Sequence, residues 1–293
     1  MNRAARFLTI FGLFLGVFAS QVASQAPASN TWTVAGHLTQ ARSGAAAVLL
    51  TDGRVLITGG TDSTGIPQAT AEVYDPAKGT YTASLAMKVP RANHAAIVMR
   101  SGDVLVTGGL TTGGGYSDSA EIYSVSSQQW TLLPSSIGTD LAYHAMAQLS
   151  DGNILIAGGT STTKVVGSLV LFNLTDQNFM PIGMLQTPRT NAVAAATPDG
   201  RVLIAGGTDI NGAVLASTEM FVYNKDTMTG SISSGPSMAF PRVGATATIT
   251  YDGVAVIGGN NGQIDLGTAE IFSQWTNTFK TVSGGTPRSH HFA

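Results

Sequence analysis

The residues of this sequence that could do chemistry are few, and the most reactive of them fall into a repeating pattern. The chain of 293 residues contains five histidines: His37, His94, His144, His290 and His291. Imidazole nitrogens bind transition metals and exchange protons near neutral pH. No HExxH motif and no cluster of histidines with carboxylates accompanies them. Since His94, His144 and His291 occupy equivalent repeat positions, we interpret them as strand-start residues and predict no metal site.

Arginine and glutamate recur as pairs at a nearly constant separation. Four pairs, 30, 30, 30 and 28 residues apart, are Arg42 with Glu72, Arg91 with Glu121, Arg189 with Glu219 and Arg242 with Glu270. In the third repeat both partners are replaced, by Leu141 and Val170. Removing one partner of a buried ion pair costs about 3–5 kcal/mol, whereas replacing both by apolar groups is often neutral. We therefore predict structural ion pairs; the alternative is that these are independent surface residues.

Other reactive patterns are missing from the sequence. It has no GxSxG motif, no P-loop, and no GxGxxG motif in a βαβ context. Asp62, Asp118, Asp209 and Asp265 occupy equivalent loops, where turn formation explains them. We predict no catalytic residue and no cofactor. Polar and aromatic residues in loops that we expect on one face are the candidate ligand-binding residues: Asp62, Asn93, His94, Tyr116, Tyr143, His144 and Asn191.

A phrase repeated five times indicates which elements hold these residues. DGRVLITGG ends at Gly60, and related phrases end in the glycine pairs 108–109, 158–159, 206–207 and 258–259. The steps between the pairs are 49, 50, 48 and 52 residues. A period of about 50 residues with four short strands per unit is typical of the blades of a β-propeller. The sequence therefore predicts an all-β propeller.

Each repeat supplies four strands, which we expect to run from the axis outward. Ala-rich strands lie at 45–50, 94–99, 144–149, 191–197 and 244–250, and the glycine phrase follows each. Third strands lie at 71–74, 120–123, 169–172, 218–221 and 269–272, and fourth strands carry Tyr81, Trp130, Phe179, Met228 and Phe279. Alanine is a poor strand former, so an Ala-rich strand indicates the crowded axis, where only small side chains fit.

The two ends of the repeat array are out of phase. Trp32 lies ten residues before Arg42, as Tyr81 lies ten before Arg91, so 31–34 reads as a fourth strand without its blade. At the other end, 287–293 reads as the start of a sixth inner strand. We expect five complete blades plus an incomplete sixth, in a propeller truncated at its C-terminus. A five-bladed ring with a spare tail is the alternative.

The N-terminal residues indicate the compartment of the protein, and its net charge indicates which classes of partner it does not bind. Arg3 and Arg6, the apolar run 7–18 and the small residues that follow indicate a signal peptide at 1–24, with the propeller at 25–293. We expect a protein that is secreted or held in the periplasm or cell envelope, with no stable membrane span after cleavage. A net charge of −2 without a basic run argues against nucleic-acid binding. The chain has no cysteine, hence no disulfide.

The pattern PRxxHAA, DGxVLVxGG, AEIY and a following Trp resembles bacterial kelch repeats, such as those of the galactose oxidase central domain. This resemblance extends over about 32–293 and implies a binding platform for a glycan or protein ligand. It also implies an alternative, a carbohydrate-active or oxidase-like enzyme. The copper cofactor of galactose oxidase includes a Tyr cross-linked to a Cys, and this chain lacks Cys.

Overall fold

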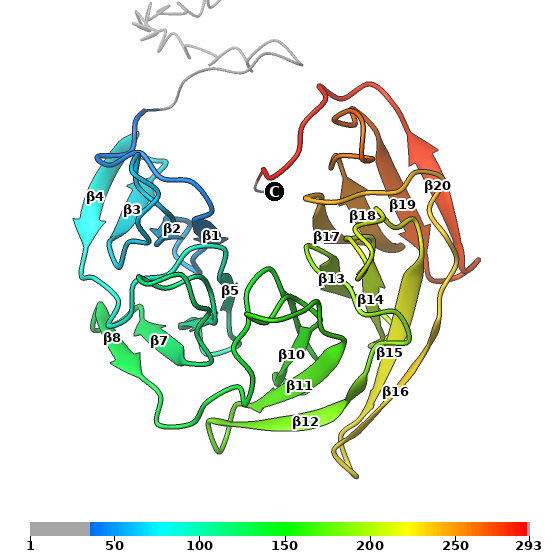
Figure 1. Cartoon of the computed structure of the whole chain (residues 1–293), viewed down its shortest axis with the longest axis horizontal. Coiled ribbons are helices and arrows are strands. Elements are labelled where there is room, and N and C mark those ends of the chain that lie inside the picture. The colour runs from blue at the N-terminus through cyan, green and yellow to red at the C-terminus, as the bar shows by residue number, and fades with distance from the viewer. Residues whose placement is uncertain (1–35, 292–293) are drawn as a thin grey trace, which may run out of the picture. The chain divides into compact units, whose positions relative to one another are not determined.

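The chain folds into five small sheets, each built from four antiparallel strands (Figure 1). The structure, a computed structural model, describes residues 36–291. The predicted signal peptide and the strand predicted at 31–34 lie outside these residues. Within the described part, twenty strands and no helix occur, so no helix there is long and apolar enough to cross a membrane. The predicted β-propeller with five complete blades is confirmed.

The strands of each blade are ordered along the chain. The innermost strands are β1(Ala46–Leu49), β5(Ala95–Val98), β9(Ala145–Gln148), β13(Val193–Ala196) and β17(Thr246–Thr250). The second strands are β2(Val55–Thr58), β6(Val104–Thr107), β10(Ile154–Ala157), β14(Val202–Ala205) and β18(Gly253–Ile257). The third strands are β3(Ala71–Asp75), β7(Ala120–Ser124), β11(Ser168–Asn173), β15(Thr218–Asn224) and β19(Ala269–Ser273). The outer strands are β4(Thr80–Ser84), β8(Gln129–Leu132), β12(Asn178–Met184), β16(Thr229–Ser234) and β20(Thr278–Val282).

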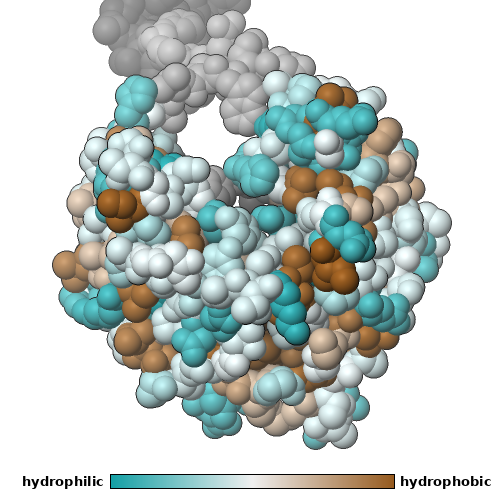
Figure 2. All heavy atoms as spheres, viewed as in Figure 1, coloured by the Kyte–Doolittle hydropathy of each residue, from teal (hydrophilic) through white to brown (hydrophobic). Residues whose placement is uncertain are grey.

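The blades follow one another around an axis, with an opening between the first and the fifth. The inner strands contact in the order β1, β5, β9, β13, β17. Figure 1 shows the opening between the blade of β1 and the blade of β17, and the space-filling view of Figure 2 keeps it with side chains in place. Among residues 36–291 no strand belongs to a sixth blade. The predicted sixth inner strand is therefore not formed there, because an inner strand needs a second strand of its own blade to pair with.

The hydrophobic core lies between successive blades. We call the side of a blade that meets the preceding blade its leading face and the other side its trailing face. Val104, Tyr123 and Trp130 on the leading face of blade 2 form one buried cluster with Leu56 and Val73 on the trailing face of blade 1. On the leading face the rings of Tyr123 and Trp130 pack with centroids 5.0 Å apart. Each interblade junction thus buries aromatic and branched side chains against the next sheet.

The fourth blade departs from the predicted pattern at its outer hairpin. Strand β15 runs to Asn224, so Met228 falls in the turn, with φ of 53° and 37% of its surface exposed. Phe221 pairs instead with Ile232 on β16. The prediction that Met228 is the large core residue of this outer strand is therefore wrong. The hairpin is longer by two residues on each strand, so the partner of Phe221 lies four residues later than in the other blades, and spacing alone could not reveal this.

The paired glycines of the repeated phrase allow close contact between neighbouring blades. Gly108 has φ of 65°, and a Cβ there would lie 2.2 Å from the carbonyl oxygen of Leu141 in the next blade. The amide of Gly109 donates a hydrogen bond of 2.7 Å to that same oxygen. Both the left-handed conformation and the missing side chain favour glycine. The phrase recurs because every blade must join the next in this way.

Candidate functional site

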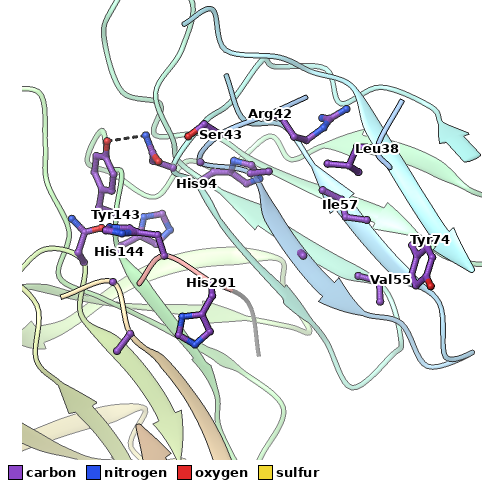
Figure 3. A pocket seen from close by; sticks show the side chains of 18 of the residues that line it. Leu38, Arg42, Ser43, Val55, Ile57, Tyr74, His94, Tyr143, His144 and His291 are labelled. Carbon is purple, nitrogen blue, oxygen red and sulfur yellow. Dashed lines mark hydrogen bonds between the residues drawn. The ribbon is translucent and has the colours of Figure 1, made fainter. Parts of the chain in front are cut away.

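A cavity of about 770 Å³ opens at the axis and extends along the leading face of blade 1. Its axial part is lined by residues from the starts of the inner strands, including Asn93, His94, Tyr143, His144, Asn191 and His290 (Figure 3). Its outer arm is lined by Leu38, Val55, Ile57, Tyr74 and Tyr81. Six of the seven predicted ligand-binding residues therefore lie at or near this cavity, as the next paragraphs describe, and Asp62 does not.

The axial part is built on a ring of residues in left-handed backbone conformation. We call these residues the axial ring: Gly44, Asn93, Tyr143, Asn191, Gly244 and His290, with φ between 52° and 64°. Main-chain hydrogen bonds link the first four members in series, and a separate bond links the last two. The amide of Asn93 donates to Gly44 O over 2.7 Å, that of Tyr143 to Asn93 O over 2.9 Å, and that of Asn191 to Tyr143 O over 2.9 Å. The amide of His290 donates to Gly244 O over 2.7 Å. Each of the five blades thus places one such residue before its inner strand, and His290 adds a sixth after blade 5.

Side chains of the axial ring also contact one another. Asn93 Nδ2 donates a hydrogen bond of 2.8 Å to the hydroxyl of Tyr143, drawn as a dashed line in Figure 3. The rings of Tyr116 and Tyr143 meet edge to face with centroids 6.5 Å apart. Burial, with a smaller effect of Tyr116, raises the pKa of Tyr143. This edge of the cavity therefore presents a neutral phenol and a carboxamide held in fixed positions.

The repeat histidines bridge neighbouring blades and stay neutral. His94 Nε2 lies 2.8 Å from Thr58 Oγ1, and His144 Nε2 lies 2.7 Å from Thr107 Oγ1. Both rings are only 7% exposed, and burial, aided by the positive charge of Arg91, lowers the pKa of each to about 3. His291 Nε2 lies 3.2 Å from Thr246 Oγ1, which is on the inner strand of blade 5 rather than on its second strand. No group of histidines and carboxylates in the described part of the chain is arranged to hold a metal ion.

The four Arg–Glu pairs lie within blades and anchor the segments that connect them. Every pair is joined by an Nη2 to Oε1 contact, at 2.8 Å for Arg42 with Glu72, 3.1 Å for Arg91 with Glu121, 3.0 Å for Arg189 with Glu219 and 2.9 Å for Arg242 with Glu270. Arg91 Nη1 also donates to Gly108 O, while Glu121 accepts the amides of Lys88 and Val89. Burial lowers the pKa of Arg91, with Glu121 opposing this effect.

The third blade fills the same place with apolar side chains. Leu141 is fully buried and Val170 is 4% exposed, and both belong to one cluster with Ile137 and Ile156. The structure thus shows the double replacement as an apolar contact at the position of the ion pair. In the first blade burial raises the pKa of Glu72, but the amide of Thr39 and the charge of Arg42 outweigh it, and the pKa lies below its usual range.

The structure separates Asp62 from the other candidates and adds residues that were not predicted. Asp62 accepts hydrogen bonds from Thr64 and Ile66 in its own loop, which holds a turn. Tyr116 reaches the site through its contact with Tyr143 rather than by lining the cavity. Among the residues not predicted is His290. Aligning the repeats at Asn93, Tyr143 and Asn191 would have found it, because it occupies the same column.

Comparison with known proteins agrees with the fold. The family described as Kelch motif matches residues 42–83 and 90–136, which are blades 1 and 2. A solved structure named "Structure of YjhT" superimposes with a TM-score of 0.67 at 14% sequence identity, covering 83% of this chain and 84% of that one. At this identity the likeness shows the fold alone. A search of curated proteins found no match.

Proposed function

Because this chain is a five-bladed β-propeller that carries kelch motifs, we propose that it is a binding platform that is secreted or held in the cell envelope. Its ligand is a neutral glycan that enters the axial cavity. The observation that carries the proposal is the axial ring, in which three consecutive blades hold Asn93, Tyr143 and Asn191 in left-handed conformation. The ring points polar side chains at one cavity from rigid strands.

The backbone conformation of the axial ring supports a functional role. A left-handed conformation costs a non-glycine residue about 1–3 kcal/mol, and such strain is often found at ligand-binding sites. Blades 1 and 5 avoid this cost with Gly44 and Gly244 at the same position. The fold therefore accepts glycine here, and Asn93, Tyr143 and Asn191 add polar side chains at the cavity that this backbone position does not require.

The charges around the cavity favour a neutral ligand. The guanidinium of Arg42 is held by Glu72 and by two carbonyl oxygens, and His94 and His144 are uncharged near neutral pH. No carboxylate occurs among the residues that line the described cavity. Glycoside hydrolysis generally uses a pair of carboxylates, so this lining supports binding rather than cleavage. Amide and phenol groups beside an aromatic ring suit the hydroxyls and the apolar face of a sugar.

The test combines a glycan microarray with calorimetry on the chain that begins at Gln25. Asn93→Gly and Asn191→Gly keep the backbone conformation and remove only the side chains, so we expect at least a tenfold loss of affinity, about 1.4 kcal/mol, without a lower melting temperature. Gln128→Gly is the matched control, because Gln128 has φ of 58° in an outer turn. If no glycan on the array binds, or if Asn93→Gly binds glycan as tightly as the unaltered chain, the proposal is contradicted. A protein ligand is then the next candidate.

A further inference from the structure

Two asparagines of the chain are followed directly by glycine, and they lie in equivalent loops of neighbouring blades. Asn211 precedes Gly212 in the loop after β14, and Asn261 precedes Gly262 in the loop after β18. The two loops are close to each other, because a Cβ at Gly262 would lie 3.4 Å from Val214 Cγ2. Neither asparagine lines the axial cavity. The fold therefore presents the same dipeptide twice, each time outside the candidate site.

An Asn–Gly dipeptide can convert its own carboxamide into a carboxylate. The main-chain nitrogen of the glycine gives its proton to a solvent base and attacks Asn Cγ. A new C–N bond closes a succinimide ring, and the carboxamide nitrogen leaves as ammonia. Water then opens the ring at either carbonyl, which yields aspartate or isoaspartate without any oxidant or reductant. Glycine favours the attack because it has no Cβ beside the nitrogen and its backbone is conformationally permissive. The reaction therefore needs a carboxamide that can turn toward the glycine nitrogen.

The carboxamide of Asn211 can make this approach. Asn211 and Gly212 are both exposed, and among residues 36–291 the carboxamide of Asn211 has no hydrogen-bond partner. A Cβ at Gly212 would have no atom within 4 Å outside its two chain neighbours, so there is room for the ring to close. The amide of Gly212 donates a bond of 3.1 Å to Asp209 O. The Asp209 carboxylate holds the loop through the amides of Asn211 and Ala213, which leaves the side chain of Asn211 unrestrained.

Hydrogen bonds restrain both reacting groups at Asn261. Its Oδ1 accepts the amide of Gln263 over 3.0 Å and that of Ile264 over 2.9 Å, which fixes the carboxamide toward its own loop. The amide of Gly262, which would have to act as the nucleophile, donates a bond of 2.7 Å to Asn260 Oδ1. Attack of Gly262 N on Asn261 Cγ therefore requires these bonds to break first, whereas Asn211 has no such bonds to its carboxamide.

We propose that Asn211 is a site of spontaneous deamidation in the folded protein, and that the hydrogen bonds of Asn261 protect it from the same reaction. The product places a second carboxylate in the loop that already contains Asp209. This loop begins beside the axial ring, because Thr208 pairs with Thr190. The modification therefore makes the cavity face more acidic as the protein ages. It does not depend on what the cavity binds.

Peptide mapping by mass spectrometry tests the proposal, because trypsin places the two asparagines on separate peptides, 202–225 and 243–280. The folded chain that begins at Gln25 is incubated in mildly alkaline buffer and sampled over time. We expect Asn211 to convert roughly tenfold faster than Asn261 or more, which corresponds to about 1.4 kcal/mol in the activation barrier. The converted peptide shows the mass gain of an acid over an amide and contains isoaspartate. Equal rates, a faster rate at Asn261, or an unmodified Asn211 would overturn the proposal.

Two controls separate the effect of the fold from that of the local sequence. In urea the hydrogen bonds of Asn261 are lost, so the two rates should converge; a difference that persists in urea would refute protection by the fold. Asn260→Ala removes the acceptor of the Gly262 amide and should raise the rate at Asn261 several-fold. Thr208→Ala, at the equivalent bridge position of blade 4, is the matched control and should leave the rate at Asn211 unchanged. An unchanged rate at Asn261 in Asn260→Ala would also contradict the proposal.

Discussion

Arg91 Nη2 lies 3.1 Å from Glu121 Oε1, and both side chains are completely shielded from solvent. Thirty residues separate the two in sequence, and the pair joins the start of blade 2 to its third strand. Glu121 also holds the amides of Lys88 and Val89 in the connection from blade 1. The pair therefore ties an interblade connection to a sheet, in addition to balancing two charges.

Removing one member of this pair should destabilise the fold strongly, whereas replacing both members by apolar residues should destabilise it less. Arg91→Leu and Glu121→Val are each expected to lower the free energy of unfolding by about 3–5 kcal/mol, because each leaves a buried charge. The double variant copies Leu141 and Val170 of blade 3 and should lose less than either single variant. Urea denaturation measures this.

The control for this cycle is the exposed pair of Asp52 with Arg54, whose removal should cost less than about 1 kcal/mol. Additive small effects of Arg91→Leu and Glu121→Val would contradict the coupling.

The buried histidines should make stability depend on pH in the acid range. In the unfolded chain a histidine has a pKa near 6.5, whereas His94 and His144 have folded pKa values of about 3. The unfolded state therefore binds more protons between these values, and stability is complete above about pH 6.5 and falls as the pH drops. Each histidine contributes a slope of up to about 1.4 kcal/mol per pH unit.

The measurement is the free energy of unfolding between pH 6.5 and 4, with and without His94→Gln. The variant is expected to show a shallower pH dependence by about one proton. His37→Gln, at an exposed position, is the matched substitution. A slope unchanged by His94→Gln would show that His94 is already protonated in the fold.

Replacing the glycine at the interblade contact by alanine should destabilise the fold. Gly108→Ala places Cβ 2.2 Å from Leu141 O, and we expect a loss of more than about 3 kcal/mol from the clash together with the positive φ. Gly212 has φ of 82° but open space around it, so Gly212→Ala measures the conformational cost alone, about 1 kcal/mol. Thermal unfolding compares the two. Equal losses would mean that the close approach between blades is not what selects Gly108.

The register of the outer hairpin in the fourth blade predicts that Ile232, and not Met228, is the core residue of the outer strand. Met228 occupies a left-handed turn position, so Met228→Gly should be neutral or slightly stabilising. Ile232 packs against the core beside Phe221, and Ile232→Ala should cost about 1–2 kcal/mol. The denaturation midpoints of the two variants show which of the two side chains stabilises the core. A larger loss for Met228→Gly would restore Met228 as the core residue.

Much of the architecture follows from local patterns that repeat. The Ala-rich strands, the glycine phrase and the period of the repeats each require only neighbouring residues to be read, and so five blades were predictable. The coincident loss of Arg and Glu at Leu141 and Val170 indicated contact across 30 residues. The register of β15 with β16 was not predictable, because the longer step of 52 residues to the next glycine pair does not show that four extra residues lie in this hairpin.

The candidate site shows where sequence reasoning ends. Sequence alone determined that Asn93, Tyr143 and Asn191 start equivalent strands, since each follows the same repeat position. Only the tertiary structure decided that main-chain hydrogen bonds join these three residues in series around the axis, that His290 lines the same cavity, and that Asp62 points into its own turn. It also decided that, among residues 36–291, no blade packs on the leading face of blade 1. The physical reason is that closure around an axis sums small rotations between blades, and whether that sum leaves an opening is a property of packing across all the junctions.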